Sequence, residues 1–303
     1  FGEKLCEMAQ DDKRICTVTA AMKSGTGLGG FARLYKDRFF DVGIAEEHAV
    51  TFSGGLAAGG MLPVFAVYST FLQRSVDQII HDVATQKLHV ILAIDRAGIV
   101  GEDGETHQGV FDVALLNPIP NVELYSPCYF EELRRDLQAA AYSNSGVVAV
   151  RYPKGGELYR PADFLPGKKT FDFYGGMSAQ ALVITYGRLF SYACIAKEAL
   201  YKSGVDVTIL KLNRIKPVPR EAILESLRFR HIFFFEEGMA AGGTGEHFMY
   251  ELSRRRWNGN YTLTAIDNRY VQHAPADASL HALHLDDEGM VHVVLKGIQE
   301  DIN

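Results

Sequence analysis

Two acidic residues and a histidine, Glu46, Glu47 and His48, interrupt an otherwise apolar stretch, VGIAEEHAVTF (residues 42–52). A carboxylate in apolar surroundings costs free energy unless it is paired, protonated or used to hold a ligand. Carboxyl groups in such settings often have shifted pKa values and act as acids or bases. This stretch is therefore a candidate for binding or proton-transfer chemistry.

A second candidate is the glycine-rich polar loop DRAGIVGEDGETHQG (residues 95–109), which follows an apolar strand pattern. In open α/β sheets, ligands bind outside the carboxyl ends of the strands. The glycines let the backbone approach a ligand, while Arg96, Asp103 and His107 offer an anion clamp, an acceptor and a proton-transfer group. A plain polar surface loop explains this pattern equally well.

Two further patterns are weaker. The stretch GTGLGG (residues 25–30) has the spelling of a dinucleotide-binding turn. Only about eight residues separate it from the next predicted strand, too few for the crossover helix that such a turn opens. We predict a flexible or cofactor-facing loop instead. The spacing of His281 and His284 could suit a metal, but no third ligand lies nearby, so we predict no metal site in this chain.

The elements that position these residues alternate between short apolar runs and amphipathic helical patterns, which is typical of parallel sheets with crossover helices. We therefore predict an α/β protein of two doubly wound, mostly parallel-sheet domains, at residues 1–158 and 177–303, with a Pro- and Gly-rich linker at 159–176. Apolar residues at helical spacing from Leu72 to Val83 predict one continuous helix. The predicted strands are 15–19, 39–42, 64–68, 90–95, 122–125 and 147–152 in the first domain, and 182–185, 205–211, 232–235 and 263–266 in the second.

Composition narrows the class of partner. The 303 residues carry a net charge of -6, without the clustered Lys and Arg that a nucleic-acid or anionic-membrane partner requires. No apolar run reaches transmembrane length and no signal-peptide pattern is present. Four scattered cysteines without C-x-x-C spacing predict reduced thiols and a cytoplasmic location. The chain starts without Met, which is compatible with a fragment, a processed product or one subunit of a larger enzyme.

Four stretches then occur in order with close-fitting spacing: RFFDVGIAEEHAVTFSGGLAAGG, VFAVYSTFLQRSVDQIIHDVA, AIDRAGIVGEDGETHQGVFD and VRYPKG. Together they resemble the second half of the 1-deoxy-D-xylulose 5-phosphate synthases, thiamine-diphosphate enzymes of the transketolase superfamily. The resemblance is almost continuous in the first domain, and it persists in the second in RIKP, EEG and DNRY (residues 214–217, 236–238 and 267–270). It implies a pyrimidine-binding domain followed by a transketolase C-terminal domain.

Roles follow from this resemblance, residue by residue. Glu46 matches the glutamate that hydrogen-bonds the pyrimidine of thiamine diphosphate and favours its imino tautomer. Phe71 would stack on the pyrimidine, and Tyr68 and Arg74 would line the pocket near the substrate. Arg96 and Lys154 would hold the phosphate of glyceraldehyde 3-phosphate. Asp103 and His107 would lie at the thiamine-bound intermediate and the acceptor aldehyde. Two departures are Glu47, where relatives commonly carry Gln, and Lys154, where many carry Arg.

The reaction that the resemblance implies is the condensation of pyruvate with glyceraldehyde 3-phosphate to 1-deoxy-D-xylulose 5-phosphate and CO₂, which feeds isoprenoid, thiamine and pyridoxal synthesis. Enzymes of this family hold the diphosphate through Mg²⁺ with a Gly-Asp-Gly motif in an N-terminal domain, and this chain lacks the motif. We therefore expect an N-terminal diphosphate-binding domain or subunit as a partner, little activity without it, and a homodimer.

Other readings stay open at this stage. The chain could be the C-terminal subunit of a split transketolase or the β subunit of a 2-oxo acid dehydrogenase, since both place a glutamate after a strand. The phrases DRAG and YSTFLQR favour the synthase. A non-catalytic dimerisation fragment is an alternative from a different class, but the presence of Glu46, Arg96, Asp103 and His107 favours a working active site.

Overall fold

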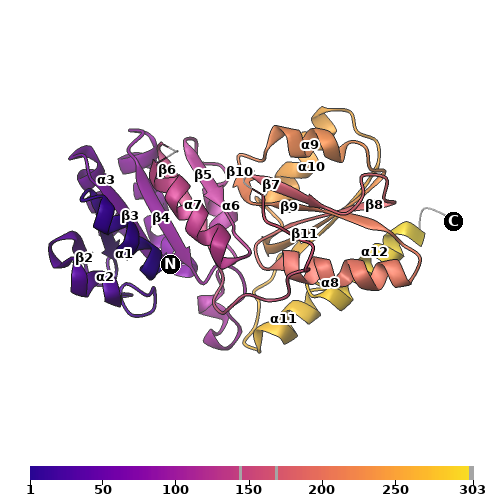
Figure 1. Cartoon of the computed structure of the whole chain (residues 1–303), viewed down its shortest axis with the longest axis horizontal. Helices are drawn as coiled ribbons and strands as arrows, with labels where there is room; N and C mark the ends of the chain where they lie inside the picture. Colours follow the sequence, from indigo (N-terminus) through magenta and orange to yellow (C-terminus); the bar gives the residue numbers. More distant parts are fainter. Residues whose placement is uncertain (143–144, 168–169, 300–303) are drawn as a thin grey trace.

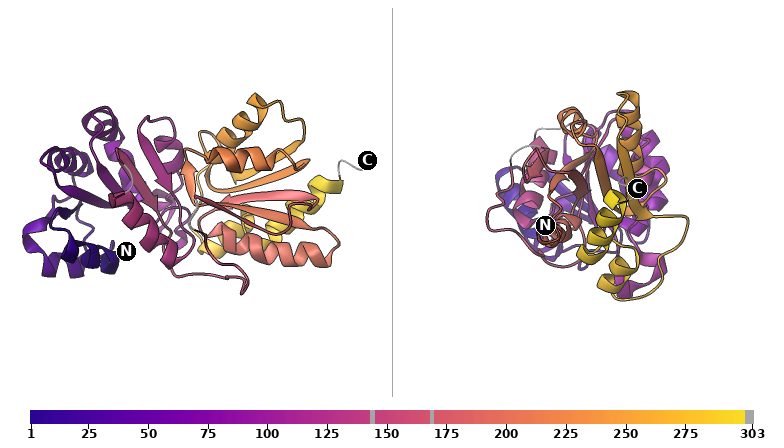
Figure 2. Two further views of the ribbon diagram at one scale, coloured as in Figure 1. Left: turned by 45° about the horizontal axis from the view of Figure 1, so that its top comes forward. Right: turned by 90° about the vertical axis from the view of Figure 1, so that its right-hand side faces the viewer.

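The computed structural model describes residues 1–142, 145–167 and 170–299, which form two sheets lying side by side along the long axis of the molecule (Figures 1 and 2). The first sheet has the strand order β10-β5-β6-β4-β3-β1-β2, and the second has the order β12-β11-β8-β9-β7. Residues 143–144, 168–169 and 300–303, which the predicted domains and linker include, lie outside the described residues.

Most neighbouring strands run parallel, which confirms the predicted fold class. Among the described strands, only the edge pairs β10–β5 and β7–β9 are antiparallel. The first sheet contains β1 (Ile15–Thr19), β2 (Phe39–Asp41), β3 (Leu62–Tyr68), β4 (Val90–Asp95), β5 (Val122–Tyr125), β6 (Val147–Arg151) and β10 (Arg214–Lys216). The second contains β7 (Phe171–Tyr174), β8 (Ala181–Tyr186), β9 (Val207–Leu212), β11 (His231–Met239) and β12 (Asn260–Ile266).

Helices cover both faces of each sheet. In the first, the buried side chains of α1, α2 and α7 pack on one face, and those of α3 and α6 on the other. In the second, α9 and α10 lie on one side and α8, α11 and α12 on the other (Figure 1). These helices are α1 (Gly2–Asp11), α2 (Gly29–Leu34), α3 (Glu46–Ala58), α6 (Asp112–Leu116), α7 (Phe130–Tyr142), α8 (Leu189–Lys202), α9 (Arg220–Ser226), α10 (Thr244–Arg254), α11 (Ala276–Ala282) and α12 (Asp287–Gln299).

The predicted helix from Leu72 to Val83 is interrupted. It consists of α4 (Ser69–Leu72), a 3₁₀ turn, α5 (Val76–Gln78) and a π-helical turn over Ile79–Ala84. The Ser75 hydroxyl donates to the Leu72 carbonyl over 2.9 Å. Such a side chain competes with the helical hydrogen bonds of the backbone, which explains a break that the apolar spacing does not predict.

Two strands do not follow the predicted division into domains and linker. β7 lies inside the segment predicted as a linker and pairs with β9 as an edge strand. β10 follows β9 in the chain but pairs with β5 of the first sheet. Backbone hydrogen bonds therefore tie a segment of the second predicted domain to the first sheet.

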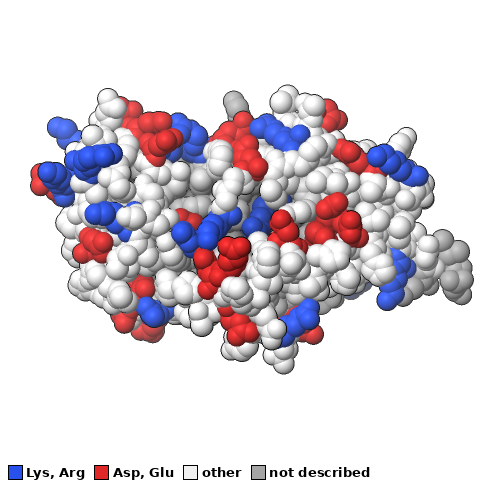
Figure 3. Space-filling view, turned by 90° about the horizontal axis from the view of Figure 1, so that it is seen from below, with Lys and Arg blue, Asp and Glu red and all other residues white. Residues whose placement is uncertain are grey.

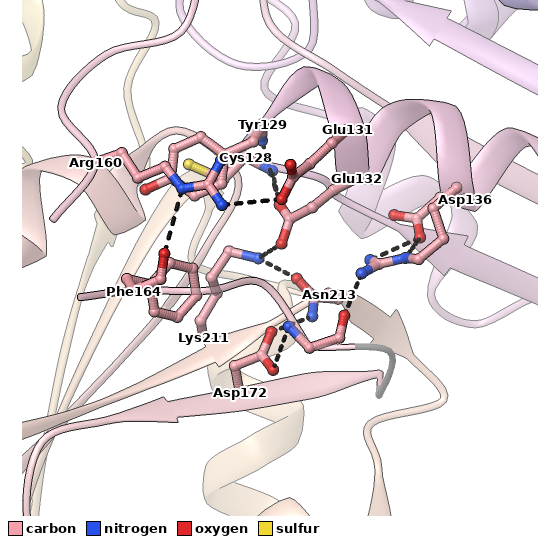
Figure 4. Close-up of polar contacts among 12 residues, drawn as sticks. Cys128, Tyr129, Glu131, Glu132, Asp136, Arg160, Phe164, Asp172, Lys211 and Asn213 are labelled. Carbon is pink, nitrogen blue, oxygen red and sulfur yellow. Dashed lines mark hydrogen bonds and ion pairs between the residues drawn. The ribbon is translucent and has the colours of Figure 1, made fainter. Parts of the chain in front are cut away.

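A buried polar network also ties the domains together (Figure 4). The ammonium of Lys211, on β9, lies 2.5 Å from a carboxylate oxygen of Glu132, on α7, and both side chains are fully buried. The other oxygen of Glu132 accepts the backbone N–H of Cys128 at 2.9 Å and that of Tyr129 at 3.2 Å, which caps the first turn of α7. Lys211 also donates to the Asn213 side chain. One carboxylate thus serves both the helix and the domain contact.

We predict that the free energy of unfolding depends on pH through Asp136, which lies on the same helix. Burial raises its pKa to about 6, although Arg135 lies 2.8 Å away. The folded chain therefore holds this proton more tightly than the unfolded chain. The stability contributed by protonated Asp136 is complete below its ordinary pKa of 3.8 and is lost as the pH rises through about 6.

We expect Asp136→Asn to raise the free energy of unfolding by about 1–2 kcal/mol at about pH 8, because an amide avoids burying a charge. The two-unit shift already includes the attraction of Arg135, and an amide NH₂ at the buried Oδ2 position, which has no hydrogen-bond partner among the described residues, offsets part of the gain. Urea unfolding at about pH 8 and about pH 4 measures the effect, which shrinks at the lower pH. An equal effect at both values would contradict the assignment.

Acidic and basic side chains are interspersed on the face of the molecule drawn in Figure 3. That face therefore lacks the continuous basic surface that nucleic-acid binding uses. Among the described residues, every helix falls short of the length and apolar character needed to cross a membrane.

Candidate active site

Glu46 is the first residue of α3 and lies on the buried face of that helix. The buried positions of α3 recur with helical spacing, at Glu46, Ala49, Val50 and Ser53. This register carries the carboxylate inward, and Glu46 is only 2% exposed. The partial positive charge at a helix N-terminus favours a carboxylate there. The neighbouring Glu47 is exposed instead.

Arg74 pairs with the buried carboxylate. Its Nη1 lies 3.1 Å from each carboxylate oxygen of Glu46, while the Arg74 side chain itself is 47% exposed. The guanidinium also lies over the Phe71 ring, 5.2 Å from its centroid. The residue predicted to face the substrate thus contacts both groups predicted to hold the pyrimidine.

Three aromatic rings gather beside this ion pair. Tyr68 and Phe71 are stacked, with centroids 6.0 Å apart, and His107 meets Phe71 edge to face at 5.5 Å. The hydroxyl of Thr70, on α4, donates to the Thr106 carbonyl over 2.7 Å. The loop that carries His107 is thereby fixed to the segment that carries Phe71, and residues from two sequence motifs form one cluster.

Arg96 extends the cluster. Its guanidinium carbon lies 3.7 Å from the Tyr68 ring centroid, and its Nη1 donates to the Gly25 carbonyl over 3.0 Å. A Cβ at Gly25 would lie 1.6 Å from the Tyr68 hydroxyl oxygen, so the backbone approaches the ring as only glycine allows. Burial raises the pKa of Tyr68, which keeps the phenol protonated. The glycine-rich stretch at residues 25–30 therefore packs on the site, and the prediction of a loop there was wrong in part, because α2 begins at Gly29.

The two predicted phosphate ligands share a cavity. Arg96, at the end of β4, and Lys154, beyond the end of β6, both line a cavity of about 290 Å³, together with Tyr129 and Gly155. Lys154 Nζ lies 3.1 Å from both carboxylate oxygens of Asp103. An anion that reaches this cavity would meet two cations, and each already has a carboxylate partner: Lys154 pairs with Asp103, and Arg96 Nη1 lies 3.4 Å from an oxygen of Asp95.

The residues fit the pyrimidine end of thiamine diphosphate. Phe71 and Tyr68 offer flat faces for stacking, and Glu46 offers a buried carboxyl group for a ring nitrogen. Within residues 1–142, 145–167 and 170–299, no group of three His, Cys, Asp or Glu side chains could hold a metal ion.

Some contacts of the site are not predicted by its sequence motifs. The Arg74–Glu46 ion pair joins residues 28 positions apart. Glu237, part of the EEG motif in the second domain, accepts the backbone N–H of Ile99 inside the loop at residues 95–109. The motif marks Glu237 as noteworthy, but only the fold brings it to this loop.

Two family models match the chain. The model for the pyrimidine binding domain of transketolase matches residues 1–158, and that for the transketolase C-terminal domain matches residues 177–290.

Curated relatives are similar over nearly the whole chain. The 1-deoxy-D-xylulose-5-phosphate synthase of Clostridium beijerinckii is 40% identical over 98% of this chain and 48% of its own length. The synthase of the same name from Caldanaerobacter subterraneus subsp. tengcongensis is 41% identical over 99% of this chain and 48% of its own length. These matches confirm the resemblance found in the motifs. The chain spans about half the length of the curated relatives it matches.

Solved structures agree with the fold. A structure titled as a split gene transketolase, inactive beta4 tetramer, superposes with a TM-score of 0.83 at 25% identity, covering 97% of this chain and 95% of that one. Transketolase from Campylobacter jejuni superposes with a TM-score of 0.81 at 16% identity, covering 97% of this chain and 45% of the other. The second likeness concerns the fold alone.

Proposed function

The chain belongs to the transketolase family, and we propose that it forms the pyrimidine-binding half of a 1-deoxy-D-xylulose 5-phosphate synthase active site. The observation that carries this proposal is the buried Glu46, whose partner Arg74 lies over Phe71, in one cluster with the cavity that Arg96 and Lys154 line. The substrates would be pyruvate and glyceraldehyde 3-phosphate. Relatives at about 40% identity that carry the synthase name support this choice.

Each residue of the cluster has a distinct task in this proposal. Thiamine diphosphate, when bound, supplies the carbon nucleophile that a decarboxylating condensation needs. Glu46 holds a ring nitrogen of the pyrimidine, and Phe71 stacks on the ring. Arg74, the partner of Glu46, lines the pocket near the substrate. His107 moves a proton at the acceptor oxygen, since imidazole exchanges protons near neutral pH.

Phosphate recognition is assigned to Arg96 and Lys154, with Asp103 as the carboxylate that holds Lys154 until phosphate arrives. A charged hydrogen bond to phosphate contributes about 1.5–3 kcal/mol, which corresponds to about 10–100-fold in affinity. A lysine binds as a point charge and lacks the planar fork of arginine.

Lys154→Met is therefore expected to raise the KM for glyceraldehyde 3-phosphate by about 10–100-fold. The KM for unphosphorylated D-glyceraldehyde should change little, because that acceptor carries no anion. Steady-state assays with the two acceptors measure the difference, and Lys154→Arg, which restores the charge, is the matched control. Equal changes for both acceptors would remove Lys154 from the phosphate site.

The proposal includes partners. A diphosphate-binding half, in the same longer protein or on a separate chain, would contribute the Mg²⁺ site. A homodimer is supported by exposed apolar side chains of the first domain, namely Ile44 at 78% and Leu34 at 65% exposure. A cytoplasmic location is supported by four cysteines that are all free thiols.

Donor selection tests the proposed function. The chain is mixed with a separately produced diphosphate-binding half of a related synthase, thiamine diphosphate and Mg²⁺, and is then offered pyruvate or a ketose phosphate. We expect turnover with pyruvate only. Turnover with the ketose phosphate alone would make the chain part of a transketolase, for which the split-gene likeness is the supporting observation. A stable complex without turnover on either donor would favour the non-catalytic alternative.

A further inference from the structure

The loop between β4 and α6, which carries Arg96, Asp103 and His107, has an unusual backbone. Arg96 has a positive φ of 57°, and the glycines at 98, 101 and 104 have φ values of 88°, 64° and 85°. A left-handed conformation at a residue other than glycine costs free energy and persists only where the surroundings hold it. The position of Arg96 therefore depends on the contacts that hold the loop in place.

The second domain holds the loop by hydrogen bonds to the backbone of Ile99. The Ile99 N–H donates to a carboxylate oxygen of Glu237 over 2.6 Å, and Arg188 Nη2 donates to the Ile99 carbonyl over 2.7 Å. Arg188 Nε also donates to the other oxygen of Glu237 over 2.9 Å, and Arg188 Nη2 makes a second, short bond to the first. The N–H and the carbonyl of Ile99, which belong to two consecutive peptide groups, thus close a ring with Glu237, near the end of β11, and Arg188, before α8.

Little water reaches this ring. The side chains of Arg188 and Glu237 are 12% and 6% exposed. A hydrogen bond to an ionised group is stronger where solvent is excluded, and a partner left alone there is costly. The two backbone bonds to Ile99 should therefore be among the firmest constraints on the loop.

Two glycines let the loop lie this close. A Cβ at Gly98 would lie 2.5 Å from the carboxyl carbon of Glu237, and a Cβ at Gly101 would lie 2.6 Å from the Ala276 nitrogen. Within the loop, Gly98 and Gly109 exchange both backbone hydrogen bonds, at 2.6 and 2.7 Å. The loop is closed at its base and pressed against the second domain.

We infer that Arg188 and Glu237 are positioning residues, which set the place of Arg96, three residues before Ile99, and of Asp103, four residues after it. They touch no substrate and act through the loop backbone. The inference rests on the proposed function, since it assigns the second domain a share in phosphate-bearing aldehyde binding. The pair would also make domain docking a condition for a formed acceptor site.

Hydrogen–deuterium exchange of the full chain tests whether Glu237 and Arg188 hold the loop in place. In Glu237→Ala we expect the amides of residues 98–100 to exchange at least about 10-fold faster than in the unsubstituted chain. The control is Asn117→Ala, which removes another hydrogen bond between the domains, from Asn117 to the Gly242 carbonyl at 2.8 Å, away from the loop. Exchange of residues 98–100 that matches the control would overturn the inference. If Glu237→Ala does not fold, Arg188→Lys, which keeps the charge and loses the fork, replaces it.

Kinetics of the assembled enzyme provide the second readout. Positioning predicts a KM for glyceraldehyde 3-phosphate raised about 10-fold in Glu237→Ala, with the KM for pyruvate changed less than about 2-fold. Equal increases for both substrates would mean a general loosening and would refute a positioning role. If the unsubstituted assembly fails to use pyruvate, the proposed function falls, while the exchange experiment still decides whether the pair holds the loop.

Discussion

Glu46→Gln is expected to lower kcat for pyruvate by about 10²–10⁴-fold in the assembled enzyme, the range that one acid–base group contributes. The amide keeps the size of the carboxyl group but cannot take up or release the proton that changes the tautomer of the pyrimidine. The side chain is 2% exposed, so water cannot readily substitute for it. Stopped-time assays of CO₂ release measure the loss, and thermal unfolding checks that the fold is intact.

Glu47→Gln is the matched control for that substitution. Glu47 follows Glu46 directly but is exposed, and the relatives named by the motif resemblance commonly carry Gln there. The same chemical change should therefore leave kcat within about 2-fold. Comparable losses at both positions, or no loss at Glu46, would contradict the assignment of Glu46.

The second large effect concerns stability. Glu132→Ala is expected to lower the free energy of unfolding by about 3–5 kcal/mol, because it leaves the Lys211 ammonium buried without its carboxylate partner. It also removes the acceptor for two backbone N–H groups at the start of α7. Urea unfolding measures the loss.

Two further variants separate the causes. Glu131→Ala removes the neighbouring carboxylate, which is 56% exposed and pairs with Arg160 at 3.0 Å, and should cost less than about 1 kcal/mol. The double variant Glu132→Leu with Lys211→Met removes both charges and should regain most of the stability that Glu132→Ala loses. A double variant as unstable as the single one would show that the cap on α7, and not the ion pair, dominates.

Strands that are buried on both faces were predictable, because such strands appear in the sequence as apolar runs. β4 and β8 are buried at every position, and their residues are apolar except for Asp95 and Thr185. β10 was not predictable, because its three residues, Arg214, Ile215 and Lys216, are too few to establish a strand period and pair across the domain boundary. Local pattern contains no information on such a partner.

The candidate site, like the strands, could be predicted from the sequence only in part. The types and spacing of residues in the first domain predict which side chains to consider, and the fold gathers Phe71, His107, Tyr68 and Arg96 in one cluster. Sequence does not reveal that Arg74 lies on Glu46, or that Glu237 holds Ile99 from 138 residues away. Those contacts arise from the packing of the segment after β3 on α3 and of one domain on the other.

The most direct test of the account is product identification. The chain, the diphosphate-binding half, thiamine diphosphate and Mg²⁺ are incubated with carboxyl-labelled pyruvate and glyceraldehyde 3-phosphate, and labelled CO₂ and the sugar phosphate are quantified together. We expect one CO₂ for each 1-deoxy-D-xylulose 5-phosphate, with both products lost in Glu46→Gln. A firm complex that forms neither product, or one that forms both equally well with Glu46→Gln, would contradict it.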